Sequence, residues 1–174
     1  MRRRVEQHVP AAEADRQLKL GPGGLRDVEF SVQLLQLVHG RADASLRSGT
    51  TLEALDALAR GGYVGRDDAA TLDDAYRLLR TLEHRIQLFR LRRTHLLPDE
   101  GDGAGRRWLA RAMGFRPDGR GDAVAVFDAE WALHAREVRR LHEKLFYRPL
   151  LHAVARVPSD QLRLSPQQAA RRLE

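Results

Sequence analysis

Apolar residues recur at helical spacing in five segments of this chain, and glycine or proline interrupts the pattern between them. An α-helix returns to the same face every 3.6 residues, so each apolar stripe predicts a helix with one buried face. The sequence therefore predicts an all-α fold, a helical bundle of about five main helices that are antiparallel where the loops are short. The expected helices span about residues 25–39, 50–60, 66–94, 106–113 and 122–147.

Short signals predict where several of these helices begin and end. Thr50, with Glu53 three residues later, predicts a capping box at the second helix. Pro149 predicts a break or kink in the fifth helix, after which helix resumes over 150–154. The Ser-Pro-Gln-Gln sequence at 165–168 is typical of a helix start. The chain ends soon after it, so we expect this sequence to be a piece of a longer protein.

The composition excludes several kinds of site. The chain has no cysteine, which excludes disulfide frameworks, thiolate zinc sites and cysteine nucleophiles. No apolar run approaches the roughly 18 residues that a membrane helix needs, and the first residues lack the apolar core of a secretory signal. We therefore expect a cytoplasmic protein with no membrane partner.

The positive charge of the chain raises the question of nucleic acid. Lys and Arg total 30 and Asp and Glu total 24, which gives a formal net charge of +6 at pH 7. Many of the arginines stand beside acids, as Arg66 does beside Asp67 and Arg136 beside Glu137. Helix faces that carry both signs are usually solvated. Nucleic acid is therefore an unlikely partner. A basic nucleic-acid-binding helical domain stays as one alternative, and it would show strongly salt-dependent affinity.

The segment before the first long helix contains the most informative residues. Residues 16–20 alternate polar and apolar, which predicts a short strand, and a Gly-Pro-Gly-Gly turn follows. A glycine-rich turn before a helix can present backbone N–H groups and the positive end of the helix dipole to an anion. A strand-to-helix corner also needs glycines for structural reasons alone. The candidate nucleotide or phosphate ligands are Lys19, Gly21, Gly23, Gly24 and Arg26.

Two acids open the first long helix. Asp27 and Glu29 are two positions apart, so they lie about 200° apart around the helix and point in different directions. They cannot form a paired-carboxylate site on one helix face. We expect at most one of them to face a bound nucleotide, while the other braces the fold.

The arginines at 90–93 have two interpretations. Cations are favoured at a helix C-terminus, which favours a solvated helix end. The same arginines could instead contact a phosphate group of a nucleotide or of a partner.

Two motifs resemble the glutamine synthetase adenylyltransferase/deadenylase family. The first is Lys-Leu-Gly-Pro-Gly-Gly-Leu-Arg-Asp-Val-Glu-Phe at 19–30, together with the helix that follows it. The second is Leu-Leu-Arg-Thr-Leu-Glu-His-Arg-Ile-Gln, which begins at Leu78, with Thr-His-Leu-Leu-Pro at 94–98. Their order and separation agree with the family, and the resemblance covers roughly 15–155. The pattern is more similar to the N-terminal, deadenylylating half of these enzymes than to the C-terminal half.

The resemblance implies a role within a larger enzyme. Members of this family carry two nucleotidyltransferase halves, each followed by a helical bundle of a type that PII uridylyltransferases share. One half attaches AMP from ATP to a tyrosine of glutamine synthetase, and the other removes it by phosphorolysis. On this basis residues 1–24 are the edge of a nucleotidyltransferase fold, 25–155 form the helical bundle, and 156–174 are a linker and the start of a helix.

The resemblance also implies cofactors and partners. The longer enzyme would use Mg²⁺ with ATP, ADP or phosphate, and we expect none of these to be bound to this chain alone. The partners would be glutamine synthetase, a PII-type signal protein and the remainder of the longer enzyme, which together control nitrogen assimilation. The alternative is a helical interaction module that docks glutamine synthetase or a PII-type regulator.

The sequence departs from the family at its metal site. The family's nucleotidyltransferase fold uses a Gly-Ser turn and paired aspartates on early strands, and this chain has neither. Gln17 stands where a third acid is common, so either Asp15 supplies it or the metal set is altered. Glu29 is then a candidate metal-proximal acid, and Asp27 a weaker one. Because phosphoryl transfer needs carboxylates to hold Mg²⁺, we expect the isolated chain to be inactive.

Overall fold

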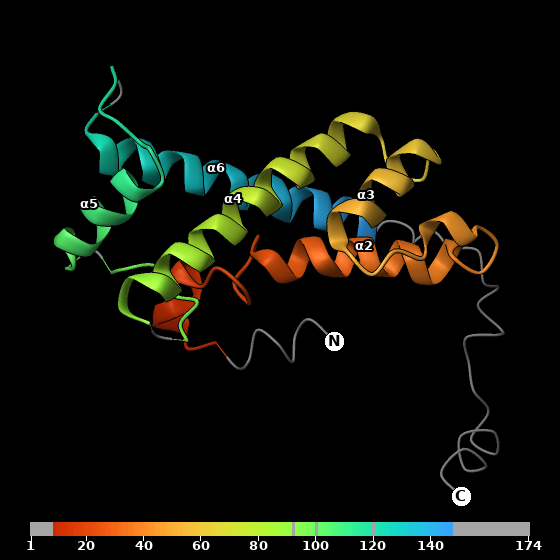
Figure 1. Ribbon diagram of the computed structural model, residues 1–174, viewed down its shortest axis with the longest axis horizontal. Coiled ribbons are helices and arrows are strands. Elements are labelled where there is room, and N and C mark those ends of the chain that lie inside the picture. Colours follow the sequence, from red (N-terminus) through yellow and green to blue (C-terminus); the bar gives the residue numbers. More distant parts are fainter. Residues whose placement is uncertain (1–8, 92, 100, 120, 148–174) are drawn as a thin grey trace, which may run out of the picture.

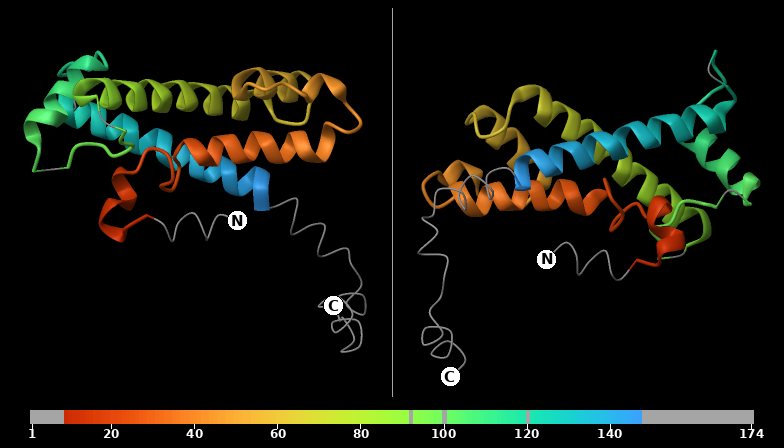
Figure 2. Two further views of the ribbon diagram at one scale, coloured as in Figure 1. Left: turned by 60° about the horizontal axis from the view of Figure 1, so that its bottom comes forward. Right: turned by 180° about the vertical axis from the view of Figure 1, so that it is seen from behind.

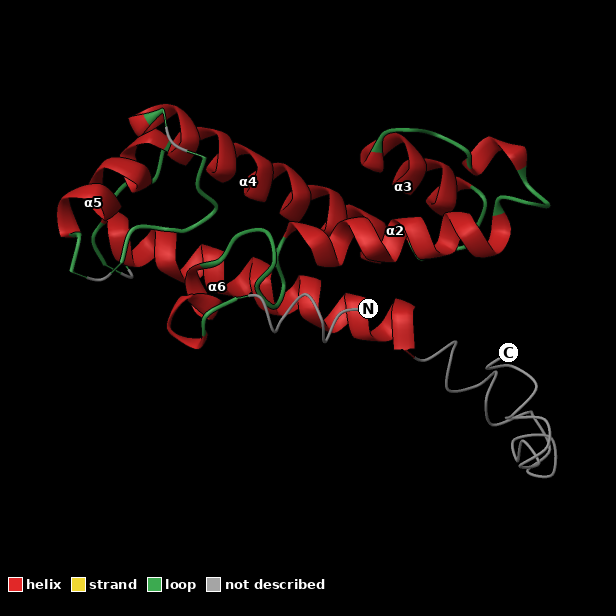
Figure 3. Cartoon of the chain, turned by 90° about the horizontal axis from the view of Figure 1, so that it is seen from below, coloured by secondary structure: helices red, strands yellow, loops and turns green. Residues whose placement is uncertain are grey.

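The computed structural model describes residues 9–91, 93–99, 101–119 and 121–147, and Figure 3 shows helices joined by loops. Within these ranges no residue lies in a β-strand, so the predicted all-α class is confirmed. The elements in chain order are η1 (Ala11–Arg16), α2 (Leu25–His39), η2 (Ala44–Leu46), α3 (Thr51–Arg60), α4 (Arg66–Arg90), α5 (Gly103–Ala112), α6 (Ala123–His142) and the π-helical η3 (Glu143–Tyr147).

Three long helices, α2, α4 and α6, contact one another and form the centre of the bundle (Figure 1). The two shorter helices lie at opposite ends: α3 packs on α2 and α4, and α5 packs on α4 and α6 (Figure 2). Leucine dominates the buried core between them, since the long helices face it with their apolar stripes. The most deeply buried apolar side chains include Leu18, Leu25, Leu58, Leu72, Leu79, Leu82, Leu109, Phe127 and Leu141.

The predicted helices at 25–39 and 50–60 are confirmed, but the capping box at Thr50 is wrong in detail. The Thr50 side chain makes no capping hydrogen bond. Glu53 instead accepts a hydrogen bond of 2.7 Å from the Ser48 hydroxyl, and the same hydroxyl accepts from the Thr50 amide. The loop before the helix therefore supplies the contact that Thr50 was expected to make.

The third helix ends earlier than predicted and the fourth begins earlier. Leu91 adopts a left-handed conformation, with φ of 48°, and stops α4 ahead of Pro98. The Asp102 carboxylate accepts from the Gly105 amide at 2.8 Å and so begins α5 at Gly103. Both differences come from backbone geometry between the helices, which the apolar pattern does not report.

The predicted fifth helix is confirmed. The Asp122 carboxylate caps it by accepting from the amides of Val124 and Ala125 at 3.0 and 2.9 Å. Helix α6 then continues into η3 as far as Tyr147. The helices expected at 150–154 and 165–168, and the linker at 156–174, lie outside the described residues. None of the described helices is long and apolar enough to span a membrane.

The strand expected over 16–20 is wrong. Arg16 ends the 3₁₀-helix η1, and Gln17 makes only a single antiparallel bridge, to Leu96. Around this bridge the Leu18 amide donates to the His95 carbonyl at 2.8 Å, and the Leu97 amide donates to the Arg16 carbonyl at 2.9 Å. The N-terminal segment is thereby held beside the end of α4 (Figure 1).

Candidate functional site

The glycines of the turn at 21–24 are needed because the chain is crowded there. Gly23 has φ of +75°, and a Cβ added to it would lie 2.0 Å from the Ala135 carbonyl oxygen of α6. A Cβ on Gly24 would lie 2.5 Å from the Leu18 carbonyl oxygen. These distances are far inside van der Waals contact, so the turn packs against α6 only if the side chains are absent.

The backbone amides of this turn already have acceptors within the chain. The amide of Gly23 donates to the Asp27 carboxylate at 2.8 Å, and that of Gly24 donates to the Gly21 carbonyl at 3.0 Å. The first helical amide, that of Leu25, donates to a carbonyl of the preceding segment at 2.9 Å, and so does the amide of Arg26 at 3.0 Å. The prediction that the glycines bind phosphate through their amides therefore gains no support from this geometry.

Asp27 and Glu29 face different surroundings, as their spacing predicts. Asp27 is fully buried, and its carboxylate holds the glycine turn. Its carbonyl accepts from the buried Ser31 hydroxyl, and the His142 ring of α6 lies 3.0 Å from that hydroxyl. Asp27 thus braces the junction of α2 with α6, while Glu29 faces α4.

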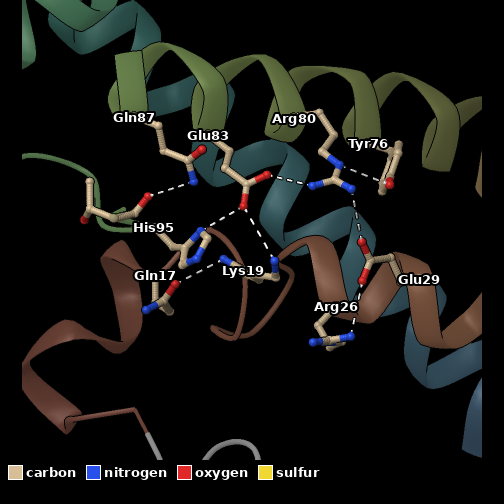
Figure 4. A network of polar contacts seen from close by, with 10 residues as sticks. Gln17, Lys19, Arg26, Glu29, Tyr76, Arg80, Glu83, Gln87 and His95 are labelled. Atoms are coloured by element: carbon tan, nitrogen blue, oxygen red, sulfur yellow. Dashed lines mark hydrogen bonds and ion pairs between the residues drawn. The ribbon is translucent and has the colours of Figure 1, made fainter. Parts of the chain in front are cut away.

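A cluster of charged side chains lies where the N-terminal segment, α2 and α4 meet (Figure 4). Its centre is Glu83 of α4, which is 3% exposed. One carboxylate oxygen, Oε2, accepts a hydrogen bond of 2.7 Å from Arg80. The other, Oε1, lies 2.8 Å from His95 Nδ1 and 3.9 Å from Lys19 Nζ. Both carboxylate oxygens of Glu83 therefore contact positively charged or ionisable groups from three parts of the chain.

Arg80 extends this cluster toward α2. Its guanidinium lies 3.7 Å from Glu29 Oε1, and Arg26 lies 3.5 Å from the other oxygen of Glu29. The Nε of Arg80 also donates to the Tyr76 hydroxyl at 3.1 Å. The ion pairs thus run from α2 to α4 and on to the segment after α4 (Figure 4).

The surroundings of Glu83 keep it ionised. Burial alone would raise the pKa of its carboxyl group. The hydrogen bond and charge of Arg80, followed by the charges of Lys19 and His95, outweigh burial and lower the pKa. Glu83 is therefore a carboxylate at neutral pH, and it can hold the basic groups around it in place.

An open depression of about 470 Å³ lies over this cluster, and we name it the α4 depression. Its floor includes the buried Glu83 carboxylate, and its other lining residues are polar or basic. They come from the N-terminal segment, α4 and the segment after α4. The lining residues are Lys19, Arg80, Glu83, His84, Gln87, Arg93 and His95.

The candidate site residues divide between two places. Lys19 lines the α4 depression. Glu29 lies beside it, because Glu29 contacts the lining residue Arg80, and Arg26 in turn contacts Glu29. The glycines at 21–24 and Asp27 are committed to packing instead. None of these contacts tests nucleotide binding, so those assignments stay predictions.

The described residues do not fit Mg²⁺. Nowhere in the described ranges do three acidic or histidine side chains gather as a metal ion would require. The candidate ligand Glu29 lies between the guanidinium groups of Arg26 and Arg80, which would compete with a metal ion for its oxygens. The described part of this chain therefore supplies no set of ligands that would hold Mg²⁺.

Sequence reasoning missed Glu83 and His95 as site residues, although both lie in the second motif. A usable signal was present in the apolar stripe of α4. Leu79, Glu83 and Ile86 follow the helical period, and Glu83 is the one charged member of the three. A charge on a buried helix face needs partners, which predicts a polar cluster at that point.

Comparison with known proteins matches the chain to one family model and to part of a set of longer proteins. A family model described as GlnD PII-uridylyltransferase matches residues 1–146. The bifunctional glutamine synthetase adenylyltransferase/adenylyl-removing enzymes of Streptomyces avermitilis and Streptomyces coelicolor are 66% and 65% identical to this chain over 173 residues. Those alignments cover 99% of the chain and 17% of each relative. The enzyme of the same name from Mycolicibacterium smegmatis is 60% identical over 154 residues, which are 88% of the chain and 15% of that relative.

Proposed function

Because this chain belongs to the GlnD PII-uridylyltransferase family, we propose that it serves as the helical domain of a longer enzyme that attaches AMP to glutamine synthetase and removes it. The names of its relatives support this activity for the longer protein. The chain spans only 17% of the length of the first two relatives, so the catalytic machinery would lie mainly in the remaining length.

One observation carries this proposal at the level of residues. Lys19 belongs to the first motif, whereas Glu83 and His95 belong to the second, and the structure joins all three in one cluster. Two distant motifs that meet at one surface indicate a shared role there. We propose that this surface borders the nucleotide site, with Lys19 nearest to it and Glu29 behind it.

The finer assignments belong to the same proposal. The chain would follow the N-terminal, deadenylylating half, in the cytoplasm, and a PII-type protein would carry the nitrogen signal. Mg²⁺ and ATP, ADP or phosphate would be held chiefly by the rest of the enzyme, because the described residues supply no metal cage. The chain alone would then lack activity.

The test uses the longer enzyme and the isolated chain side by side. We expect the isolated chain to transfer no AMP to glutamine synthetase with ATP and Mg²⁺, and to release none with phosphate. In the longer enzyme, Lys19→Ala should slow AMP removal. The control Lys144→Ala should not, because Lys144 lies in η3, outside the cluster around Glu83, and pairs with Asp68 instead. Transfer by the isolated chain above background, or equal rates in both lysine variants, would count against the proposal.

A second candidate function is docking of glutamine synthetase or a PII-type regulator. Large apolar side chains near the end of α4 favour it, since Leu88 and Leu91 are 68% and 87% exposed. Phe89 beside them is 43% exposed and stacks on Trp108 of α5. Capture of a PII-type protein by this chain, lost in Leu91→Ser, would support docking. It would be compatible with the first proposal only if Lys19→Ala still slows AMP removal in the longer enzyme.

A further inference from the structure

Residues 103–117 differ from the long helices in the sign of their charge. They contain four arginines and no acidic residue, whereas α4 and α6 carry both signs. One of the four, Arg106, is paired with Asp128 of α6. The other three are exposed, and their guanidinium groups make no hydrogen bond or ion pair within the described part of the chain. They are Arg107, Arg111 and Arg116.

These three arginines line an open hollow of about 300 Å³, which we name the α5 hollow. It lies at the end of the bundle where α5 packs against the start of α6 (Figure 1). Its larger apolar side chains come from the loop between these helices and from the first turn of α6. They are Phe115, Pro117 and Val124. The hollow therefore combines cations with an apolar floor.

The end of α5 fixes the floor of the hollow. Gly114, with φ of +85°, donates its amide to the Arg111 carbonyl at 2.9 Å. The Phe115 amide donates to the Ala110 carbonyl at 2.9 Å, and the two bonds together form a Schellman motif. The Phe115 ring then packs edge-on against the buried Phe127, with centroids 5.5 Å apart. The floor is thus in place before any partner arrives, which reduces the entropy lost on binding.

The arginines of the hollow repel one another. Arg107 and Arg111 are four positions apart and share one face of α5, a spacing at which like charges destabilise a helix. Asp122 is the one acid of the described lining, and its carboxylate already accepts from two amides at the start of α6. The formal charge of this lining is 3 − 1 = +2. An acidic ligand would therefore offset a repulsion that the described chain leaves in place.

The chemistry of the hollow favours a protein partner over a nucleic acid. Arginine beside aromatic side chains is typical of protein interfaces. Duplex DNA fits less well, because its phosphate backbone offers no apolar group to Phe115 and Pro117, and three arginines are few beside the roughly 6–10 phosphate contacts of a DNA-binding protein. We propose that the α5 hollow binds an acidic segment of a protein partner, with its carboxylates on the three arginines and one apolar side chain on the floor.

This inference goes beyond the proposed function, because none of the lining residues of the α5 hollow lines the α4 depression. Its test needs only this chain. The 174-residue protein selects from a library of synthetic heptapeptides in which every position takes Glu, Gln, Leu, Phe or Ala. We expect enrichment of peptides in which Glu flanks a Leu or Phe. The affinity of the most enriched peptide is then measured by fluorescence anisotropy at constant ionic strength.

Changes in the peptide separate the two parts of the hollow. Replacement of every Glu by Gln should weaken binding at least tenfold, because the charge-assisted hydrogen bonds to the arginines are lost. Replacement of the Leu or Phe by Ala should also weaken it at least tenfold, because the floor is left without an apolar partner.

Matched arginine variants show whether the hollow itself binds the peptide. The double variant Arg107→Gln/Arg111→Gln should weaken binding at least tenfold. The double variant Arg85→Gln/Arg136→Gln removes the same charge from exposed positions outside the lining, and it should change affinity less than twofold. All four positions are exposed, so we expect both variants to keep the circular dichroism spectrum of the parent chain.

Several outcomes would overturn the proposal. They are a selection that enriches no peptide, enriched peptides without acids or without an apolar residue, and equal weakening by the two double variants. Duplex DNA that displaces the peptide at equal concentration would assign the hollow to nucleic acid instead. Self-association in sedimentation that Arg107→Gln/Arg111→Gln abolishes would assign it to a second copy of this chain. Failure of the proposed function is measured separately, by AMP transfer and removal in the longer enzyme.

Discussion

Substitution of Gly23 by alanine should be among the most damaging single changes in this chain. The residue sits at φ of +75°, a left-handed conformation that alanine adopts at a cost of about 1–2 kcal/mol. Its added Cβ would also lie 2.0 Å from the Ala135 carbonyl oxygen. Since this neighbour is backbone of α6, it cannot move aside by a change of rotamer.

The magnitude follows from adding the two costs. Ordinary contact of a Cβ begins at 3.4 Å, so the turn and α6 must separate by more than 1 Å. Overpacking of this kind typically costs about 1–3 kcal/mol. Together with the conformational cost, Gly23→Ala should lower the free energy of unfolding by about 2–5 kcal/mol. A domain is stable by only about 5–15 kcal/mol, so the variant should be visibly destabilised.

Gly62 provides a matched control, because its φ is +76° and nothing lies within 4 Å of its added Cβ. Gly62→Ala should therefore lower the free energy of unfolding by the conformational cost alone, about 1–2 kcal/mol. The assay is urea unfolding followed by circular dichroism, with both variants and the parent chain measured together. Equal losses in the two variants would show that Gly23 does not approach α6 closely in solution, and the structural explanation of the turn would be refuted.

Three further predictions concern the bundle. Asp122→Ala removes the acceptor of two amides at the start of α6 and should cost about 1 kcal/mol, so an unchanged urea midpoint would contradict the cap. Phe127→Ala truncates a side chain that is 1% exposed and should cost about 3–5 kcal/mol, and a loss below 1 kcal/mol would place Phe127 outside the core. The lowered pKa of Glu83 gives stability that is present above the pKa of the unfolded chain and is lost as pH falls through the folded-state pKa. Glu83→Gln should therefore flatten the acid limb of the stability profile, and parallel profiles for the variant and the parent chain would refute the assignment.

The helices were predictable because their signal is local. The helix predicted at 25–39 has the same bounds as α2, Leu25 and His39, because its apolar residues recur along that whole segment. The end of α4 was missed because Leu91 leaves the helix through a backbone conformation that its residue type does not favour. Pro98 and the glycines that follow it are a clearer signal for the end of a helix, but they lie later in the chain than the observed end of α4. Local patterns therefore gave the elements, and the details of the connections depended on contacts between distant segments.

The N-terminal segment and the charged cluster illustrate the same limit. Five alternating residues at 16–20 are a weak strand signal, and the partner at 95–97 offers only one bridging residue, so no ladder forms. The cluster needs Lys19 and Glu83 to meet across much of the chain. The resemblance named both motifs, but only the folded chain shows that they share one surface.

The backbone hydrogen bonds between the segments at 16–18 and 95–97 join parts of the chain that are far apart in the sequence. The Arg16 side chain adds a further bond to the Leu97 carbonyl, between residues 81 positions apart. Closing a loop of this length costs conformational entropy, which the packing around the contact must offset. The α4 depression has lining residues on both sides of these bonds, Lys19 on one side and His95 on the other. Displacement of the N-terminal segment would therefore remove Lys19 from the depression and expose the fully buried Leu18 of the core.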